Sequence, residues 1–204
     1  MPPEKDDEAH VSLPDGAFLD RAADALFAAR TVLVYGEVNT KLARTVTAQL
    51  VALAATGDAP IRMIVHSPGG HVEAGDTIHD AVRAISAPVL MLGTGWVASA
   101  GALIYSAARK ESRFALPNTR FLLHQPLGGM GGRASDIEIE AHQILQMRER
   151  LNRIFSRATG QPYEKIVRDT ERNFWMTAAE AREYGLVHRI VETFAELQIG
   201  PSTT

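Results

Sequence analysis

The sequence predicts an α/β fold with a largely parallel sheet. Short apolar segments, suited to strands, alternate with longer amphipathic segments, suited to helices, and the pair recurs about every 30 residues. Glycine and proline separate them, as in the SPGG turn at 67–70. This alternation is typical of crossover units that place helices over parallel strands. With 204 residues, of which 46% are hydrophobic and 22% charged, the chain is long enough to bury one core.

The clearest elements lie in the first 124 residues. β-branched residues mark the first strand, while Gly57 and Pro60 end the first helix. The glycine-rich stretch between Leu92 and Ser99 is expected to be a turn. We therefore expect strands at Thr31–Tyr35, Ile61–Val65, Val89–Leu92 and Thr119–His124, and helices at Thr40–Ala55, Glu73–Ile85 and from about Ser99 onward.

The longest helix is expected after the GGMGG segment at 128–132. Ser135 and Glu138 have the spacing of a capping box at its start, and Gly160 ends it. Its pattern fits two interpretations equally: an element that protrudes for assembly, or an amphipathic helix that lies on its own domain. One apolar stripe runs along it: Ile137, Ala141, Ile144, Leu145, Leu151, Ile154 and Phe155.

Composition and charge exclude several classes of protein. The 21 basic and 24 acidic residues give a formal charge of −3, which the first ten residues alone carry, with one lysine and four acids. The balanced remainder argues against a nucleic-acid partner, because such proteins concentrate positive charge on one face. The absence of cysteine excludes disulfides and thiolate sites, and it fits a reducing compartment.

The sequence indicates a cytoplasmic protein without a membrane partner. The acidic amino terminus lacks an apolar stretch behind a basic segment, so it does not resemble a secretory signal. The 25 uncharged residues between Arg83 and Arg109 are long enough to span a bilayer. Pro88, Gly93 and Gly101 interrupt this run, which therefore favours a buried strand, a turn and a buried helix.

Two residues that follow apolar strands are candidates for nucleophilic catalysis. Ser99 is expected at a helix amino terminus, where unpaired backbone N–H groups can stabilise an oxyanion. His124 ends an apolar strand before a proline, where an imidazole can act as a general base. The SPGG turn could supply further N–H donors. Each feature alone has a plainer explanation, namely a helix cap, a structural histidine and an ordinary turn.

Metal and nucleotide chemistry find less support. His66, His71, Glu73 and His79 fall within 14 residues, but they lack a paired-histidine metal motif, so solvated side chains around a turn explain them better. Neither G-x-x-x-x-G-K-[ST] nor G-x-G-x-x-G is present. We therefore expect no bound cofactor. If the activity of this protein depends on ATP, we expect a partner protein to hydrolyse it.

These motifs together resemble one family. SPGG, GWVASAG, LPNTRFLLHQPLGG, DTER and AAEAREYGLV follow one another in an order similar to the Clp protease proteolytic subunit (ClpP), and the resemblance covers about Arg30 to Val191. It implies a ClpP/crotonase-like spiral of ββα units with a protruding handle helix. The expected divisions are an acidic, disordered tail at 1–16, a single peptidase domain at 17–193 with its handle at about 125–159, and a C-terminal tail at 194–204.

The resemblance also implies an activity and its residues. The chain would be a serine endopeptidase subunit that degrades unfolded polypeptides, with Ser99 as nucleophile, His124 as general base, and the N–H groups of Gly70 and Ala100 as the oxyanion hole. Asn173 stands where the family usually has the third, acidic member of the triad. The implied partners are further copies, in heptameric rings stacked as a tetradecamer, and an AAA+ Clp ATPase.

Two departures from the family leave alternatives open. Asn173 replaces the usual acid, and Arg62 lies on a strand where the family usually has aromatic residues that dock the ATPase. Both favour a weakly active or regulatory subunit that assembles with an active ClpP paralogue. A third interpretation is a crotonase-type acyl-CoA enzyme, which shares the spiral fold, although the serine and the histidine of HQP in this order argue against it.

Overall fold

A computed structural model describes residues 16–126 and 134–197 of the chain. The GGMGG segment and the two expected tails, apart from the ends that adjoin these ranges, lie outside the described residues. The helices are α1 (Gly16–Ala28), α2 (Thr40–Ala55), α3 (Val72–Ala84), α4 (Ala100–Tyr105), α5 (Ala134–Thr159), α6 (Tyr163–Asp169) and α7 (Ala178–Tyr184), with 3-10 turns at Lys110–Ser112 and Phe194–Glu196. The strands are β1 (Thr31–Tyr35), β2 (Ile61–Ser67), β3 (Val89–Ala98), β4 (Arg113–Ala115), β5 (Arg120–Leu123), β6 (Phe174–Thr177) and β7 (Arg189–Ile190).

Within the described residues the strands form one sheet, and most of its pairs are parallel. Its main path is β1-β2-β3-β4-β7, while β5 pairs with β3 and with β6. Only the β5–β6 pair is antiparallel among these. The prediction of an α/β fold with a largely parallel sheet is therefore confirmed.

Strand β3 is longer than the sequence predicted, and its length shapes the molecule. We expected a turn after Leu92, but β3 continues through two glycines to Ala98. The first half pairs with β4, from Met91 to Gly93, and the second half pairs with β5, from Trp96 to Ala98. The sheet branches between these two halves. Glycine is needed at this point, because a Cβ on Gly93 would crowd Phe121 and Thr119. The prediction of a turn here was wrong.

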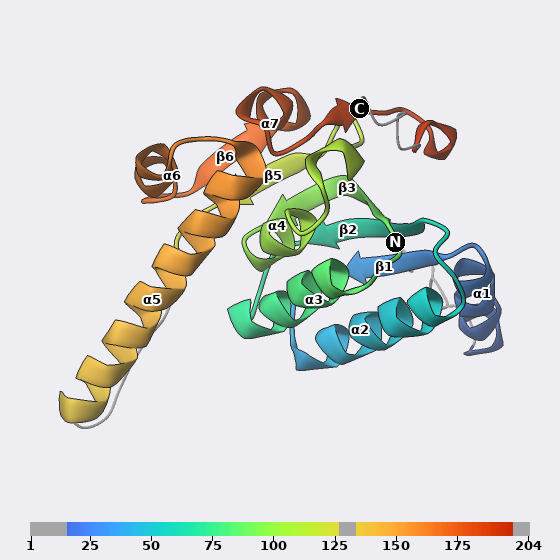
Figure 1. The fold of residues 1–204 in the computed structure, drawn as a ribbon, viewed down its shortest axis with the longest axis horizontal. Helices are drawn as coiled ribbons and strands as arrows, with labels where there is room; N and C mark the ends of the chain where they lie inside the picture. Colours follow the sequence, from blue (N-terminus) through green and yellow to red (C-terminus); the bar gives the residue numbers. More distant parts are fainter. Residues whose placement is uncertain (1–15, 127–133, 198–204) are drawn as a thin grey trace, which may run out of the picture.

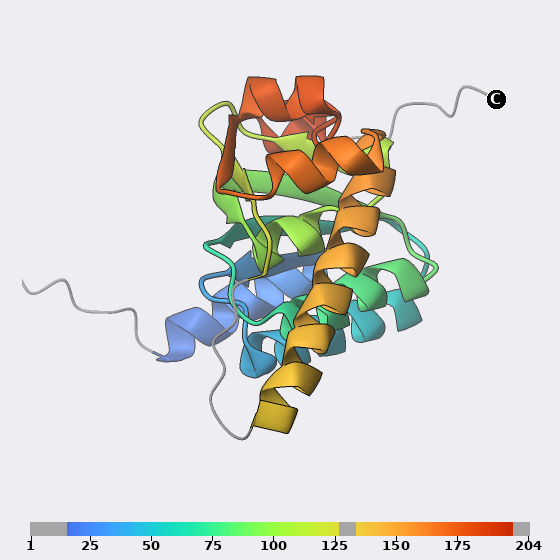
Figure 2. The same cartoon turned by 90° about the vertical axis from the view of Figure 1, so that its left-hand side faces the viewer.

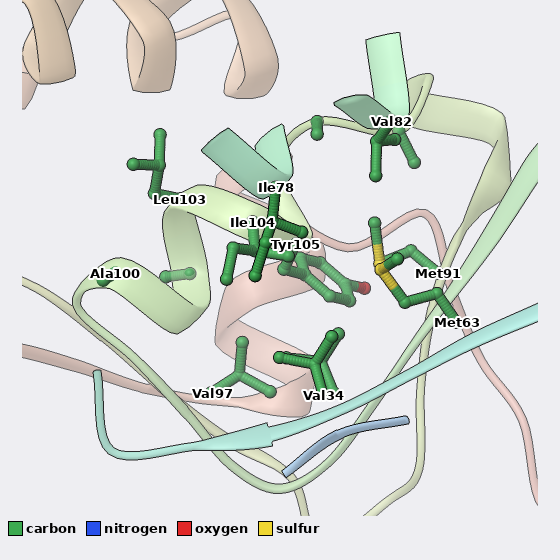
Figure 3. Packing of buried hydrophobic residues seen from close by; sticks show 14 of the residues in the cluster. Val34, Met63, Ile78, Val82, Met91, Val97, Ala100, Leu103, Ile104 and Tyr105 are labelled. Carbon is green, nitrogen blue, oxygen red and sulfur yellow. The ribbon is translucent and has the colours of Figure 1, made fainter. Parts of the chain in front are cut away.

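Three helices cover one face of the sheet and enclose the core. Figure 1 shows α2 and α3 side by side along β1 and β2, and α4 packs beside α3. Strand side chains such as Val34 and Met63 meet Ile78 of α3 and Leu103 of α4, all of them buried (Figure 3). The uncharged run that is long enough for a membrane span forms β3 and α4 inside this core. Among the described helices none is both long and apolar enough to cross a bilayer.

Helix α5 has two halves with different surroundings. Its C-terminal half packs on the core, where Leu151 and Phe155 are buried. Its N-terminal half projects away from the body (Figures 1 and 2), and Leu145 there is 60% exposed. Each interpretation of the apolar stripe therefore describes one half of the helix. The predicted cap was wrong, since Ser135 lies inside the helix, which begins at Ala134.

The face of the sheet opposite these helices carries aromatic side chains near the carboxyl ends of the strands. The rings of Tyr35 and His66 lie 5.4 Å apart, and Trp96 stacks on Trp175 with centroids 5.6 Å apart. The guanidinium of Arg120 lies 4.5 Å from the centre of the Trp175 ring. Trp96 and Trp175 thus bridge β3 and β6 across β5.

Candidate active site

The sheet topology brings four chain segments to one place. The SPGG turn follows β2, Ser99 follows β3, and His124 follows β5, and these three strands run parallel as neighbours. Strand β6 is antiparallel to β5, with Phe174 opposite Leu123, so Asn173 before β6 meets His124 after β5. The carboxyl ends of adjacent parallel strands are a common place for reactive groups, because loops converge there.

Ser99 has the backbone of a residue held out of its preferred conformation. Its φ is 55° and its ψ is −121°, an unusual combination for a residue other than glycine. It is the N-cap residue of α4, yet its side chain caps no backbone N–H. A cap therefore does not explain this serine, and its hydroxyl is half-buried and directed elsewhere.

The Ser99 hydroxyl contacts His124, which in turn contacts Asn173. The Nε2 atom of His124 lies 2.8 Å from Ser99 Oγ, and its Nδ1 lies 3.1 Å from Asn173 Oδ1. An Nδ1–H that donates to the amide oxygen leaves Nε2 free to accept the serine proton. The three predicted candidates thus lie together in the order that acyl-transfer sites use.

The two predicted oxyanion donors adjoin residues at the serine: Ala100 follows Ser99, and Gly70 follows Gly69, where an added Cβ would lie 2.6 Å from the Cβ of Ser99. Gly70 has φ 145°, and a Cβ there would lie 2.3 Å from the oxygen of Val38, so only glycine fits. Val38 fixes the turn through two backbone bonds, because its N–H donates to Gly69 O and its oxygen accepts from His71 N–H, each at 2.8 Å. Among the described residues, the N–H groups of Gly70 and Ala100 have no recorded hydrogen-bond partner.

An apolar pocket adjoins the serine and histidine. Its wall includes Val72 and Leu103 from the body and Leu151 and Phe155 from α5. Sequence analysis missed these residues as site residues. The apolar stripe on the long helix was predicted from the sequence, but periodicity alone does not determine which part of the molecule the stripe packs against.

Asp169 and Glu171, which neighbour Asn173, are engaged elsewhere. Asp169 accepts hydrogen bonds from Lys165 Nζ at 2.5 Å and Tyr184 Oη at 2.6 Å, and Glu171 pairs with Arg148 at 2.5 Å. Burial opposes the charged form of Asp169, yet these hydrogen bonds together bring its pKa below the ordinary value. Neither carboxylate contacts His124 in the structure.

The histidines near the SPGG turn have separate partners. His79 is buried beside Asp80, at 3.0 Å, and His71 lies 3.7 Å from Glu73. His66 Nδ1 accepts from the N–H of Trp96 at 3.2 Å. Over residues 16–126 and 134–197 no group of three or more metal-ligating side chains comes together.

The comparisons with known proteins agree with this arrangement. An "ATP-dependent Clp protease proteolytic subunit 2" of Gluconobacter oxydans is 62% identical over 175 residues, or 85% of this chain and 78% of that one. A "proteolytic subunit 3" of Rhizobium etli is 56% identical over 198 residues, covering 97% and 100% of the two chains.

Solved structures show the same likeness. ClpP1 from Listeria monocytogenes has a TM-score of 0.79 at 50% identity, covering 87% of this chain and 99% of that one. An asparagine-to-aspartate mutant of that protein has a TM-score of 0.81 at 51% identity with the same coverage. These matches favour neither the crotonase nor the regulatory-subunit alternative. The Clp protease family model matches residues 15–194, nearly the whole described chain, and the chain therefore belongs to the Clp protease family.

Proposed function

We propose that this Clp protease subunit cleaves polypeptides by acyl transfer, with Ser99 as nucleophile, His124 as general base and Asn173 as the residue that orients the imidazole. The observation that carries the proposal is the continuous contact from Ser99 Oγ through both nitrogens of His124 to Asn173 Oδ1. A hydroxyl becomes a competent nucleophile when an adjacent base can take its proton, and the base needs a third group to fix its tautomer.

The steps follow from these contacts. Ser99 Oγ forms a bond to the scissile carbonyl carbon while its proton passes to His124 Nε2. The oxyanion of the tetrahedral intermediate lies against the N–H groups of Gly70 and Ala100. When the C–N bond breaks, His124 returns the proton to the leaving amine, and a serine ester remains. Water then attacks this ester, with His124 again as the base, and releases the acid and the free serine.

The pocket beside the serine supports a preference for apolar side chains. Its volume is only about 10 Å³, so it does not enclose a side chain, but its aliphatic and aromatic walls give an apolar contact surface next to Ser99. We infer that the residue on the acyl side of the cleaved bond is apolar. Unfolded polypeptides expose such residues, so they are the proposed substrates.

We further infer assembly into heptameric rings, stacked in pairs through α5, and association with an AAA+ Clp ATPase that unfolds substrates. Family membership supports oligomeric assembly. The exposed apolar side chains on the projecting half of α5, Ile137, Ile139 and Leu145, support a role for this helix in it. In this assembly the subunit needs no cofactor of its own.

The proposed location is the cytoplasm. The absence of cysteine is in keeping with such a reducing compartment.

Labelling with a fluorophosphonate tests the assignment of the nucleophile. The assembled wild-type protein should gain one adduct per subunit, located on Ser99 by mass spectrometry. Ser99→Ala should abolish labelling and leave the sedimentation profile unchanged, whereas Ser106→Ala, a buried serine of the same region, should label normally. An adduct on another residue would show that Ser99 is not the nucleophile.

A further inference from the structure

A second cavity, outside the candidate active site, lies between α3, α4 and α5. Its volume is about 640 Å³, and it is bounded by the C-terminal half of α3, the segment after α4 and the last turns of α5. Those helices are neighbours in the body of the molecule (Figure 1). The residues of the candidate triad do not line it. The lining residues are His79, Asp80, Arg83, Ser106, Ala108, Arg109, Lys110, Arg113, Arg150, Ile154, Arg157, Ala158 and Gly160.

The lining is strongly basic in a chain whose net charge is −3. Six of these side chains are arginine or lysine, and one is a carboxylate, Asp80, which lies 3.0 Å from His79. Arg150 is neutralised by Asp76 at 2.5 Å. Among the described residues no ion pair is recorded for the other five cations, Arg83, Arg109, Lys110, Arg113 and Arg157.

Arg113 is the unusual member of this group, because it is buried. It is 1% exposed, and only its Nη2 has a partner, the oxygen of Ala158 at the end of α5, at 2.5 Å. Its Nε and Nη1 are buried without a hydrogen-bond partner. Burial lowers the pKa of Arg113, an effect that Tyr105 and Glu111 oppose. A buried guanidinium with two unpaired donors is unfavourable, and a nearby anion would offset that cost.

We propose that this cavity binds a compact polyvalent phosphate, such as an inorganic oligophosphate or the phosphate chain of a nucleotide. Arginine fits phosphate oxygens in a bidentate way, and four of the five unpaired cations sit on α3, α5 or the segment after α4 with exposed side chains. The five unpaired cations carry more positive charge than one phosphate group can neutralise, so a ligand with several phosphate groups fits the cavity better. The lining contains no Phe, Tyr or Trp, so it offers no stacking surface for a base, and recognition should rest on the phosphates.

Calorimetry on the full-length, assembled protein tests this proposal. Sodium tripolyphosphate should bind saturably with one site per subunit at constant ionic strength, and orthophosphate should bind at least tenfold more weakly. The variant Arg109→Gln/Arg157→Gln should bind tripolyphosphate about 100-fold more weakly, because each charge-assisted hydrogen bond to phosphate contributes a factor of about ten. These positions are exposed, so the fold should be kept, which Arg113→Gln does not guarantee.

The control variant is Arg44→Gln/Arg182→Gln, which removes two exposed arginines from α2 and α7 and should bind as wild type does. A nucleoside triphosphate, added without metal, distinguishes the two possible sources of the phosphates. An affinity equal to that of tripolyphosphate shows that the phosphate chain alone is recognised, and tighter binding identifies a nucleotide as the ligand. No saturable binding, or an equal loss in both variants, overturns the proposal. Binding only by dissociated subunits also overturns it, because a second copy would then fill the cavity.

Discussion

The amide of Asn173 can meet His124 in two ways, and only one supports catalysis. With Oδ1 toward Nδ1, at 3.1 Å, the imidazole keeps its proton on Nδ1 and accepts from Ser99. With the amide turned over, its NH₂ would force the proton onto Nε2, where it opposes the serine. A carboxylate has no such wrong orientation, and its charge also stabilises the imidazolium.

Asn173→Asp should therefore raise peptide turnover about tenfold or more, from a slow but measurable wild-type rate. Asn173→Ala should be slower than wild type, because nothing then fixes the tautomer. The measurement is hydrolysis of a fluorogenic peptide at matched assembly state. Asp169→Ala serves as the comparison, and if it is inactive while Asn173→Ala keeps wild-type turnover, the orienting residue is Asp169.

Substitution of Gly70 tests the oxyanion hole, and a control substitution can separate the effect of a steric clash from the effect of backbone strain. Gly70→Ala places a Cβ 2.3 Å from Val38 O, so the turn must shift and its N–H must move away from the oxyanion. Fluorophosphonate labelling of Ser99 should slow about 100-fold, the usual cost of losing one oxyanion donor.

The matched control is Gly57→Ala. Gly57 has a similar φ, 136°, but its added Cβ would meet nothing within 4 Å. The Gly57→Ala variant should therefore have the same kind of backbone strain, and Ser99 in it should be labelled at the wild-type rate. Equal labelling rates in both variants would remove Gly70 from the site.

At the scale of elements, α5 carries two leucines with opposite surroundings. Leu151 is 6% exposed and packs beside the active-site pocket, whereas Leu145 is 60% exposed on the projecting half. Leu151→Ala should lower the free energy of unfolding of the dissociated subunit by about 3 kcal/mol. Leu145→Ala should change it by less than about 0.5 kcal/mol and should instead weaken assembly.

Urea unfolding and sedimentation velocity measure the two effects of these leucine variants separately. Deletion of 128–132, just outside the described residues, should likewise convert double rings to single rings. A wild-type sedimentation profile for both Leu145→Ala and the deletion would mean that α5 contributes only to its own subunit.

The network of Lys165, Asp169 and Tyr184 joins α6 to α7 and should depend on pH. The pKa of Asp169 is lowered in the folded state, so the network stabilises the protein fully above the ordinary carboxyl value of 3.8. This contribution is lost as the pH falls from 3.8 through the lower, folded-state pKa. Asp169→Asn should therefore lower the Tm at pH 7, and the difference from wild type should shrink below pH 3.8. A Tm difference that stays constant through this range would show that the charge of Asp169 does not stabilise the fold.

At the scale of the whole molecule, Arg62 bears on partner docking. It donates to Ala29 O at 2.9 Å and lines a 530 Å³ cavity with Leu90 and Leu197. An apolar loop of an ATPase would have to cover this guanidinium without an acid to pair it. Wild-type homomers should thus bind a Clp ATPase weakly, and Arg62→Tyr should bind about tenfold more tightly by interferometry. The control Arg44→Tyr should leave binding unchanged, and tight docking by the wild type would contradict the prediction.

Much of the fold was predictable, because its strands and helices carry strong local signals. Strand β1 and helix α2 have the predicted bounds, since β-branched residues and a following glycine define them locally. The branch at β3 was not predictable, because glycines usually break strands, whereas here Gly93 allows the close approach of Phe121 and Thr119 and Gly95 that of His66. Helices α1, α6 and α7 and strands β4, β6 and β7 were also not predicted. Strands β4 and β7 are only two or three residues long and depend on their neighbours in the sheet.

The candidate site was predictable only where its residues stood in a motif. Ser99 and His124 follow strands with distinctive sequences, and the structure brings them together with Asn173. The partners of Asp169 and the pocket wall from α5 depend on tertiary contacts, which no periodicity encodes. The cluster around Arg113 likewise gathers residues from four parts of the chain, each ordinary by itself.

The stacked Trp96 and Trp175 are the only two tryptophans in the sequence, so all indole emission from this protein originates at one spot. Trp96 lies three residues before Ser99 and Trp175 two residues after Asn173. The guanidinium of Arg120 lies 4.5 Å from the centre of the Trp175 ring, so a cation contacts one of the two indoles. Tryptophan emission is therefore a label-free signal from a point close in sequence to the candidate triad, and stopped-flow fluorescence during acylation of Ser99 tests whether the stack responds.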